Sequence, residues 1–510
     1  MRKWWPLVTI CLGTFMLLVD VTIVNVALPK MAEDLGTSFS ALQWVVDAYA
    51  LTLAALLMGV GSFSDIVGHR RAYIAGLSLF AVSSLVCGIS PNVGTLIAAR
   101  AVQGLGAAAM FATTFALLNS SYSGRDRGIA YGMWGAVSGA SAALGPIVGG
   151  VLTQGLSWRW IFFVNLPFSV AAVLLSLAVL SGDRPTSRQR VDLPGMVTFT
   201  AAAGALTFAA IRASDDGWIS GPVIALLLLS VIAVISFVLA ELRSDHALLD
   251  LGLFRSRSFV GIMIAALLIN FAAFAVFTYT SIWLQSLLGL SPIEAGLTGL
   301  PLSAAAFLVS AGIGRFLHGT SPGPIIGGGL ILIGVGGVLS GLLVHSGSSW
   351  PALVAGFTIC GVGVGLATPT LSSSAMAAVT PQRGGMAAGA VNTARQLGFA
   401  LGIAILGSVF TARAAHSLSA KGVDGASALA STLAGGQAHV LISRAPAASR
   451  AQLLSDFRGA FASGLDAAFL VAGAIGILAG VAVLVLVRPG AGSAPATEPA
   501  PWDTAKAVTP

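Results

Sequence analysis

Charged residues are scarce in this sequence. Only 9% of its 510 residues are Asp, Glu, Lys or Arg, against about 25% in soluble globular domains. Apolar residues make up 56% of the chain, and stretches of roughly 20 predominantly apolar residues recur from Val8 to Val487. This composition excludes an ordinary soluble domain and predicts an all-α integral membrane protein.

Lysine is nearly absent, and none of the lysines follows a glycine. They are Lys3, Lys30, Lys421 and Lys506. A phosphate-binding loop needs the dipeptide Gly-Lys before Ser or Thr, so the sequence contains no such loop. A pump driven directly by ATP is therefore excluded.

Cysteine and histidine are also few. The three cysteines, Cys11, Cys87 and Cys360, all lie inside apolar stretches, which implies no disulfide framework. The six histidines fall in separate loops or at loop edges, so no catalytic or metal-binding cluster emerges. We expect neither an enzyme nor a cofactor; a membrane sensor remains an alternative that a flux measurement would distinguish.

Apolar windows separated by polar breaks predict fourteen membrane spans. They begin near residues 7, 41, 72, 93, 131, 161, 193, 221, 258, 294, 323, 351, 385 and 463. The basic start and first apolar run imitate a secretory signal, but no small-residue cleavage site follows and the run continues through Asp20 to Pro29. We therefore interpret the first run as an uncleaved span.

The distribution of basic residues predicts the orientation. With the N-terminus in the cytoplasm, the short inner loops carry Arg70, Arg71, Arg125, Arg127, Arg184, Arg188, Arg190, Arg243, Arg255, Arg257, Arg315 and Arg383. The short outer loops carry only Lys30, Arg159 and Arg212. This asymmetry predicts a multi-pass protein of the plasma membrane with both termini in the cytoplasm. Because the basic residues are scattered and not gathered in a patch, no nucleic-acid partner is expected.

A weak repeat divides the chain. Arg127-Gly128 and Arg383-Gly384 each open a span rich in Gly and Ala, 256 residues apart. We predict a six-helix bundle at 1–185, two inserted helices at 186–245 and a second six-helix bundle at 246–488. The last of these includes a long outer loop at 413–462, with a short helix around 450–461 on the outer face. The segment 489–510, rich in Pro and Ala, is predicted to be a disordered tail.

The most specific motif joins the second and third predicted spans. It contains Gly61, Asp65, Gly68, Arg70 and Arg71. Glycine at 68 permits a tight turn, and Asp65 can accept hydrogen bonds from arginines or a helix N-terminus. The pattern resembles the loop signature of the major facilitator superfamily, which implies a latch between conformations; the alternative is an ordinary basic turn.

Two further segments carry the same resemblance. The fourth span contains Arg100 with Gln103, similar to that family's intramembrane arginine motif, although an arginine snorkelling to the outer interface is an alternative. The fifth span resembles the family's antiporter motif; its candidate residues are Gly139, Gly145, Pro146, Gly149 and Gly150. Close helix packing alone would also explain these small residues.

The segment from Leu18 to Pro29 resembles the signature of the fourteen-span drug:proton antiporter branch, as do Trp158 to Pro167 and Leu249 to Phe254. Burial favours a neutral carboxyl group and a nearby arginine favours the charged form, so a buried acid can take up and release a proton. We therefore predict Asp20 and Arg100 as the proton-coupling pair; a permanent structural bond is the alternative.

Other polar residues inside apolar spans are candidates for a substrate cavity. They are Asn25, Asp47, Gln103, Asn270 and Arg395. Asp47 could equally be an interfacial carboxylate, and Arg395 could equally serve helix packing. Phe271, Phe274, Phe277 and Tyr279 are expected to face lipid or pack, not to bind substrate.

Together, the resemblance implies a major facilitator fold of two bundles that works by alternating access. The implied function is proton-driven efflux of small amphipathic drugs or antibiotics, by a protein functional as a monomer in the lipid bilayer. The alternative within this fold is a proton symporter that imports a nutrient.

Overall fold

The computed structural model describes residues 2–37, 39–181, 192–244, 249–316, 320–379, 384–436, 438–444, 446 and 449–487. Within these residues every regular element is helical. Continuous helices are expected in lipid, since each one satisfies its own backbone N–H and C=O groups. The predicted inner-loop residues Arg184, Arg188, Arg190 and Arg383, and the predicted tail, lie outside the described residues.

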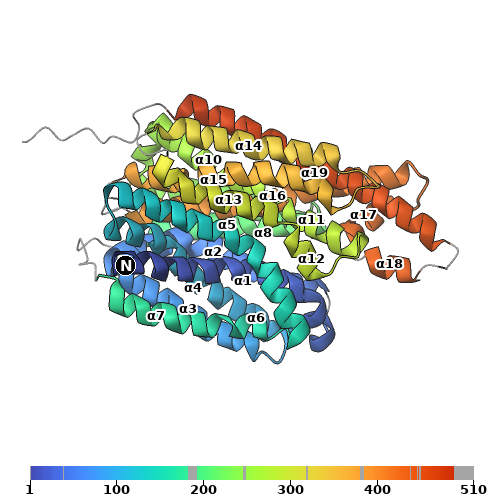
Figure 1. The fold of residues 1–510 in the computed structure, drawn as a ribbon, viewed down its shortest axis with the longest axis horizontal. Helices are drawn as coiled ribbons and strands as arrows, with labels where there is room; N and C mark the ends of the chain where they lie inside the picture. The colour runs from blue at the N-terminus through green and yellow to red at the C-terminus, as the bar shows by residue number, and fades with distance from the viewer. Residues whose placement is uncertain are drawn as a thin grey trace, which may run out of the picture.

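The N-terminal part of the chain forms one bundle (Figure 1). Its helices are α1 (Trp5–Leu35), α2 (Phe39–Val67), α3 (His69–Gly88), α4 (Val93–Ser121), α5 (Gly124–Gly155), α6 (Trp160–Phe163) and α7 (Asn165–Val179). Helices α2 and α3 pack on α4, while α1 packs on α5 and α7. Helix α1 is therefore held at the centre of its bundle.

Two helices follow as a hairpin, α8 (Leu193–Asp216) and α9 (Gly221–Glu241). Helix α8 packs against α2 and also against α16 of the second bundle. The indole N–H of Trp218 donates to Ser408 Oγ at 2.7 Å, and the rings of Trp44 and Phe208 meet edge to face with centroids 5.2 Å apart. The hairpin therefore contacts both bundles.

The remaining helices form the second bundle (Figure 1). They are η2 (Leu251–Arg255), α10 (Arg257–Ala273), α11 (Phe277–Ile282), η3 (Trp283–Leu287), α12 (Pro292–Leu297), α13 (Leu300–Phe316), α14 (Pro322–Leu343), η4 (Trp350–Leu353), α15 (Val354–Ala377), α16 (Gly384–Ser419), α17 (Ala426–Ala434), α18 (Ala438–Arg444) and α19 (Arg450–Leu486). A helix occurs at each of the predicted span positions. The predicted boundaries at 185, 245 and 488 adjoin or fall in undescribed segments, so they stay predictions.

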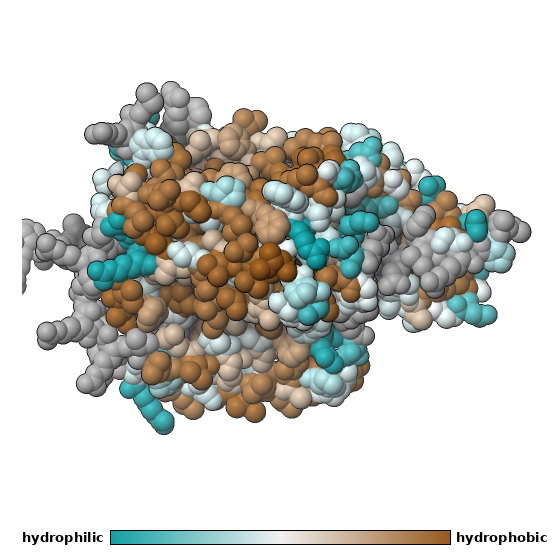
Figure 2. Space-filling model, turned by 90° about the horizontal axis from the view of Figure 1, so that it is seen from below, coloured by the Kyte–Doolittle hydropathy of each residue, from teal (hydrophilic) through white to brown (hydrophobic). Residues whose placement is uncertain are grey.

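Thirteen of the described helical segments are long and apolar enough to cross a membrane. Helix α5, at the fifth predicted span, is 32 residues long but is not among them, so the count of fourteen spans stays a prediction. Large apolar side chains point outward, as at Leu174, Leu308, Leu478 and Val485, which are 61–70% exposed. Hydrophobic residues predominate along the flank in Figure 2. This surface suits lipid.

The described part of the segment 413–462, predicted as a long outer loop, is mostly helical. Helix α16 continues to Ser419, α17 and α18 follow, and α19 starts at Arg450 and runs without a break for 37 residues. The predicted short helix on the outer face is therefore the first part of α19. Phe457 and Phe461 are both 0% exposed, and the ring of Phe461 lies 4.6 Å from that of Phe410 on α16, so this part of α19 packs against its neighbours.

The described chain begins and ends at one end of the molecule, here called the terminal end; α17 and α18 mark the opposite, loop end (Figure 1). Helix α5 packs along α13, and α2 packs along α16. A Cβ on Gly389 of α16 would stand 3.0 Å from Met58 Cα of α2. Asn392 of α16 donates to Phe111 O of α4 at 3.4 Å. The two bundles are therefore in close contact in the terminal half.

Candidate functional site

The centre of the N-terminal bundle contains a buried ion pair. Arg100 Nη1 of α4 lies 2.5 Å from Asp20 Oδ2 of α1, and both side chains are 0% exposed. Leaving either charge alone in such a place costs several kcal/mol. The two residues that the sequence predicted as a pair are thus in direct contact, and Arg100 does not reach an outer surface.

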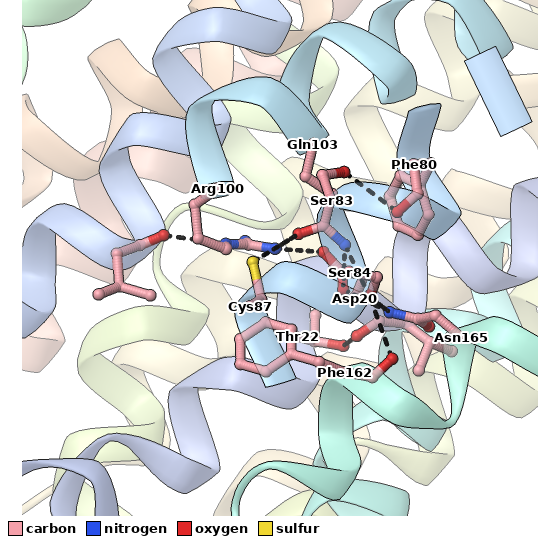
Figure 3. A network of polar contacts seen from close by, with 12 residues as sticks. Asp20, Thr22, Phe80, Ser83, Ser84, Cys87, Arg100, Gln103, Phe162 and Asn165 are labelled. Carbon is pink, nitrogen blue, oxygen red and sulfur yellow. Dashed lines mark hydrogen bonds and ion pairs between the residues drawn. The ribbon is translucent and has the colours of Figure 1, made fainter. Parts of the chain in front are cut away.

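Neutral donors complete the surroundings of Asp20 (Figure 3). Gln103 Nε2 donates to Asp20 Oδ1 at 3.1 Å, and Asn165 Nδ2 of α7 donates to the same oxygen at 2.8 Å. Both amides also contact Ser84 Oγ of α3, at 3.3 and 3.0 Å. The carboxylate on α1 is therefore bound from α4 and α7, and α3 joins the network through Ser84.

Arg100 has further contacts that do not involve Asp20. Its Nε donates to the backbone oxygen of Val45 at 3.0 Å, and its Nη1 donates to Gln103 Oε1 at 2.8 Å. The guanidinium carbon lies 4.2 Å from the ring centre of Tyr49 on α2, a distance at which a cation is attracted to an aromatic face. Arg100 would therefore keep three partners if Asp20 became neutral.

This arrangement can exist in two states. With Asp20 charged, the carboxylate accepts from Arg100, Gln103 and Asn165. A proton on Asp20 would remove the ion pair while leaving polar partners to both residues. Proton binding would consequently weaken the attachment of α1 to α4. Such a site can convert a proton into a change of helix packing.

Sequence reasoning missed part of this site. Asn165 was noticed only within a motif, Ser84 was not singled out, and Gln103 was assigned to a substrate cavity although the structure places it in the Asp20 network. A signal was present, since all three are polar side chains within apolar runs and Gln103 follows Arg100 at helical spacing. No local signal indicates which of them meet.

The other cavity candidates are not brought together in this way. Asp47 on α2 is half-buried, and the side chain of Asn25 lies outside the described residues. Asn270 Oδ1 on α10 and Arg395 Nη1 on α16 are buried atoms with no hydrogen-bond partner in the described part of the chain. Helices α10 and α16 are neighbours, so these two residues stay candidates for binding polar groups. Phe271 and Tyr279 are buried packing residues.

The predicted latch lies at the terminal end, between the bundles. Asp65 Oδ2 at the end of α2 accepts a hydrogen bond from Met386 N in the first turn of α16, at 3.2 Å, and Asp65 Oδ1 lies 3.5 Å from His69 Nε2. A carboxylate at a helix N-terminus is favoured by the helix dipole. Asp65 therefore links the two bundles directly.

The neighbouring residues of this motif shape the turn. Gly68 has a φ of +97°, a conformation that side chains other than glycine rarely adopt, and it separates α2 from α3. Arg70 donates to the backbone oxygens of Leu177 at 2.7 Å and Ser176 at 3.3 Å, at the end of α7. Gly61 is buried, whereas Arg71 is exposed. Arg70 thus has a structural contact within its own bundle.

The glycines of α5 mark close helix approaches. A Cβ on Gly149 would stand 2.9 Å from Ile23 O of α1, and a Cβ on Gly145 would stand closer still to Thr22 Oγ1 of α1. A Cβ on Gly139 would stand 3.2 Å from Ala306 Cβ of α13, and one on Gly150 would stand 2.6 Å from Ile293 of α12. The side chain of Pro146 lies outside the described residues. Helix α5 therefore contacts both α1, which carries Asp20, and the second bundle.

Comparison with known proteins agrees with this geometry. The family model described as the Major Facilitator Superfamily matches residues 10–403. The chain is 36% identical to the puromycin resistance protein pur8 of Streptomyces alboniger over 443 residues, which covers 85% of this chain and 87% of that protein. It is 31% identical to the multidrug efflux pump LfrA of Mycolicibacterium smegmatis, covering 96% of this chain and 97% of the pump.

Solved structures share the fold at low sequence identity. The human organic anion transporter MFSD10 superposes with a TM-score of 0.61 and 16% identity, covering 94% of this chain and 99% of that one. The proton:xylose symporter XylE superposes with a TM-score of 0.59 and 12% identity, covering 96% and 97%. The all-helical architecture, the contacts between two bundles and the matched family model together identify the chain as a membrane transporter of the major facilitator superfamily.

Proposed function

We propose that this protein exports small amphipathic drugs or antibiotics across the plasma membrane in exchange for protons. The relatives named for puromycin resistance and multidrug efflux, each matched over most of its length, support export. The fold by itself does not determine direction, since a proton:xylose symporter shares it. The observation that carries the coupling is the fully buried pair of Asp20 and Arg100.

Asp20 is the proposed proton carrier and Arg100 its partner. When the site opens to the outside, a proton neutralises Asp20 and the ion pair is lost. When it opens to the cytoplasm, the proton leaves and Arg100 again binds the carboxylate. Each proton moving inward down the membrane potential supplies about 2.3 kcal/mol per 100 mV, which is enough to concentrate a solute outside the cell.

The contacts between the bundles support alternating access as the mechanism. The hydrogen bond from Met386 N to Asp65 belongs to the terminal half, where α2 meets α16. We assign the terminal end to the cytoplasm, in line with the basic inner loops. Asp65 would then be part of a cytoplasmic latch that breaks when the cavity opens inward, and α5 would carry motion between α1 and the second bundle. We further propose that a monomer suffices, since both bundles belong to one chain.

Efflux of a fluorescent cationic dye from inverted vesicles or cells expressing the protein tests this function. We expect extrusion that a protonophore stops and that Asp20→Asn abolishes at normal protein levels. Asp34→Asn is the matched control, because Asp34 is a half-exposed carboxylate near the loop end, paired with Arg159 at 2.7 Å.

Each contrary outcome has a distinct meaning. Extrusion by Asp20→Asn that still responds to a protonophore would refute the coupling site but not export. Extrusion by the unaltered protein that ignores the protonophore would refute proton coupling. Uptake of a nutrient driven by an inward proton gradient, with no efflux of any dye, would refute export.

A further inference from the structure

A groove with a volume of about 310 Å³ opens beside the inserted hairpin. Its walls come mainly from α8, α9, η2 and α16. Ser230 is the polar residue among those that line it, and its hydroxyl donates to Ala202 O at 2.9 Å. The described lining residues therefore offer no free hydrogen-bonding side chain, and a cavity of this kind suits an apolar ligand and not water.

The groove runs from the terminal end to about the middle of the membrane. Leu251 and Phe254 of η2 line it at the terminal end. Leu206 and Leu397 line it deeper, each 13 positions after the first residue of its helix, α8 or α16. With a rise of about 1.5 Å per residue, they lie roughly 20 Å along helices that begin at the terminal end. The hydrocarbon of one leaflet is about 15 Å deep, so the groove is deep enough for one acyl chain.

The groove faces the lipid side of the hairpin. Val234 of α9 and Phe254 of η2, on its two sides, are 47% and 40% exposed. Helix α9 packs along α8, and its other large side chains point outward, as at Ile232, which is 61% exposed. At this depth of a bilayer the surrounding medium is acyl chain, not water. Lipid tails are therefore the apolar molecules that reach the groove first.

Basic residues surround the end of the groove at the terminal end. Arg255 directly follows Phe254, Arg257 is the first residue of α10, and Arg243 lies two positions after the end of α9. All three are exposed, and none forms an ion pair with a described residue. The acid beside them, Asp250, is half-buried and accepts a backbone hydrogen bond within η2 at 2.9 Å. Positive charge therefore predominates where the groove reaches the membrane surface.

We propose that the groove binds one anionic phospholipid of the leaflet at the terminal end. One acyl chain lies between α9 and the wall formed by η2 and α16, and the phosphate is bound by Arg255 and Arg257. Guanidinium groups suit phosphate because they donate parallel hydrogen bonds to two of its oxygens. Basic sites between membrane helices select anionic head groups for the same reason. A cationic amphiphile is disfavoured, since its charge would meet the arginines.

The bound lipid has a structural consequence for the hairpin. One side of the groove belongs to α8 and α9, and the other belongs to η2 and α16 of the second bundle. An acyl chain between them contacts both, so it adds apolar contacts between the hairpin and the second bundle. Lipid binding should therefore stabilise the folded protein. The proposal concerns this lipid alone and holds whichever solute the protein moves and in whichever direction.

Native mass spectrometry of the purified full-length protein tests the head-group preference. The probes are dioleoyl phosphatidylglycerol, which is anionic, and dioleoyl phosphatidylcholine, which is zwitterionic with the same acyl chains. Each surface arginine is worth about fivefold in affinity for anionic lipid, so Arg255→Gln/Arg257→Gln should reduce the preference for phosphatidylglycerol roughly 25-fold. Arg71→Gln/Arg125→Gln is the matched control, since it removes two exposed arginines at the same end, and it should keep the preference. Because the readout is a ratio within each variant, a general loss of stability does not affect it.

Thermal melting tests the acyl-chain part of the site. Phosphatidylglycerol should raise the melting temperature of the unaltered protein more than phosphatidylcholine does. Val234→Trp should remove this difference, because the indole fills the groove from its lipid-facing side. Ile232→Trp is the control, since Ile232 also faces outward but does not line the groove, and it should keep the difference. Inorganic phosphate alone should have no effect, because the acyl chain supplies the apolar contacts.

Several outcomes would overturn the proposal. Equal binding of the two lipids by the unaltered protein would refute the anionic preference, and an unchanged preference in Arg255→Gln/Arg257→Gln would refute the head-group site. A difference in melting temperature that survives in Val234→Trp would place the lipid elsewhere. Stabilisation by inorganic phosphate equal to that by phosphatidylglycerol would show a site for the free anion. Displacement of phosphatidylglycerol by a cationic dye, with dye binding lost in Val234→Trp, would assign the groove to a transported solute.

Discussion

Replacing Arg100 by methionine should expose the energetic coupling within the buried pair. The change keeps an unbranched side chain in α4 but leaves the Asp20 carboxylate, which is 0% exposed, with only Gln103 and Asn165 as donors. Removing one member of a buried pair costs about 3–5 kcal/mol in soluble proteins. Two neutral donors remain, so we expect a loss near the lower limit, about 3 kcal/mol.

The double variant Asp20→Asn/Arg100→Met is the decisive comparison. Because it removes both charges, it should recover most of the stability that Arg100→Met loses. Asp20→Asn by itself should cost less, because Arg100 retains Val45 O, Gln103 Oε1 and the face of Tyr49.

The three buried cysteines provide the assay. Cys11, Cys87 and Cys360 are free and buried, so a thiol-reactive fluorogenic dye reports their exposure as the protein unfolds on heating. Arg159→Met is the control, because its pair with Asp34 has side chains 31% and 47% exposed and should be worth at most about 1 kcal/mol. If the double variant loses the sum of the two single losses, the residues are not coupled and our reasoning about the site is refuted.

Two further predictions concern helix packing and pH. Gly149→Ala should destabilise the protein by about 1–3 kcal/mol in the same thermal assay, because its Cβ would stand 2.9 Å from Ile23 O. Gly155→Ala is the control and should have no such effect, because a Cβ there would have nothing within 4 Å. Equal losses of stability in the two variants would contradict the packing argument. Hydrogen bonds from the indole of Trp158 and from Arg159 lower the pKa of Asp34. The ionised carboxylate should therefore contribute fully to the stability of the folded protein at neutral pH, and this contribution should be lost as the pH falls below about 4. Asp34→Asn should accordingly lower the melting temperature slightly at pH 7 and by less at about pH 3, and a loss of the same size at both values would argue against this ionic contribution.

Much of the architecture follows from sequence, because helix formation in lipid is local. Each apolar run must satisfy its own backbone groups, so the positions of the helices can be predicted from composition alone. The segment after Arg413 shows the limit of this argument. Its small, partly polar residues give no hydropathy signal, and only packing around Phe457 and Phe461 shows that α19 starts well before its apolar stretch.

The same limit applies to the candidate site: the sequence marks individual residues, and only packing decides which of them are in contact. A charge inside an apolar run is conspicuous, and this marked Asp20, Arg100 and Arg395, the first two together with their resemblance to family motifs. Their hydrogen-bond partners cannot be predicted in this way, since Asn165, which donates to Asp20, lies 145 residues away in the sequence.

Asp192, immediately before α8, and Glu241, the last residue of α9, carried no sequence signal, because each stands at the end of an apolar run where solvated acids are common. Only the folding of α8 against α9, with a glycine between the carboxyl groups, buries them side by side. Sequence by itself therefore determined that this chain crosses the membrane as helices and which of its charges are unusual. Tertiary structure decided which charges share a site, since side chains far apart in the chain interact only after packing has excluded water from between them.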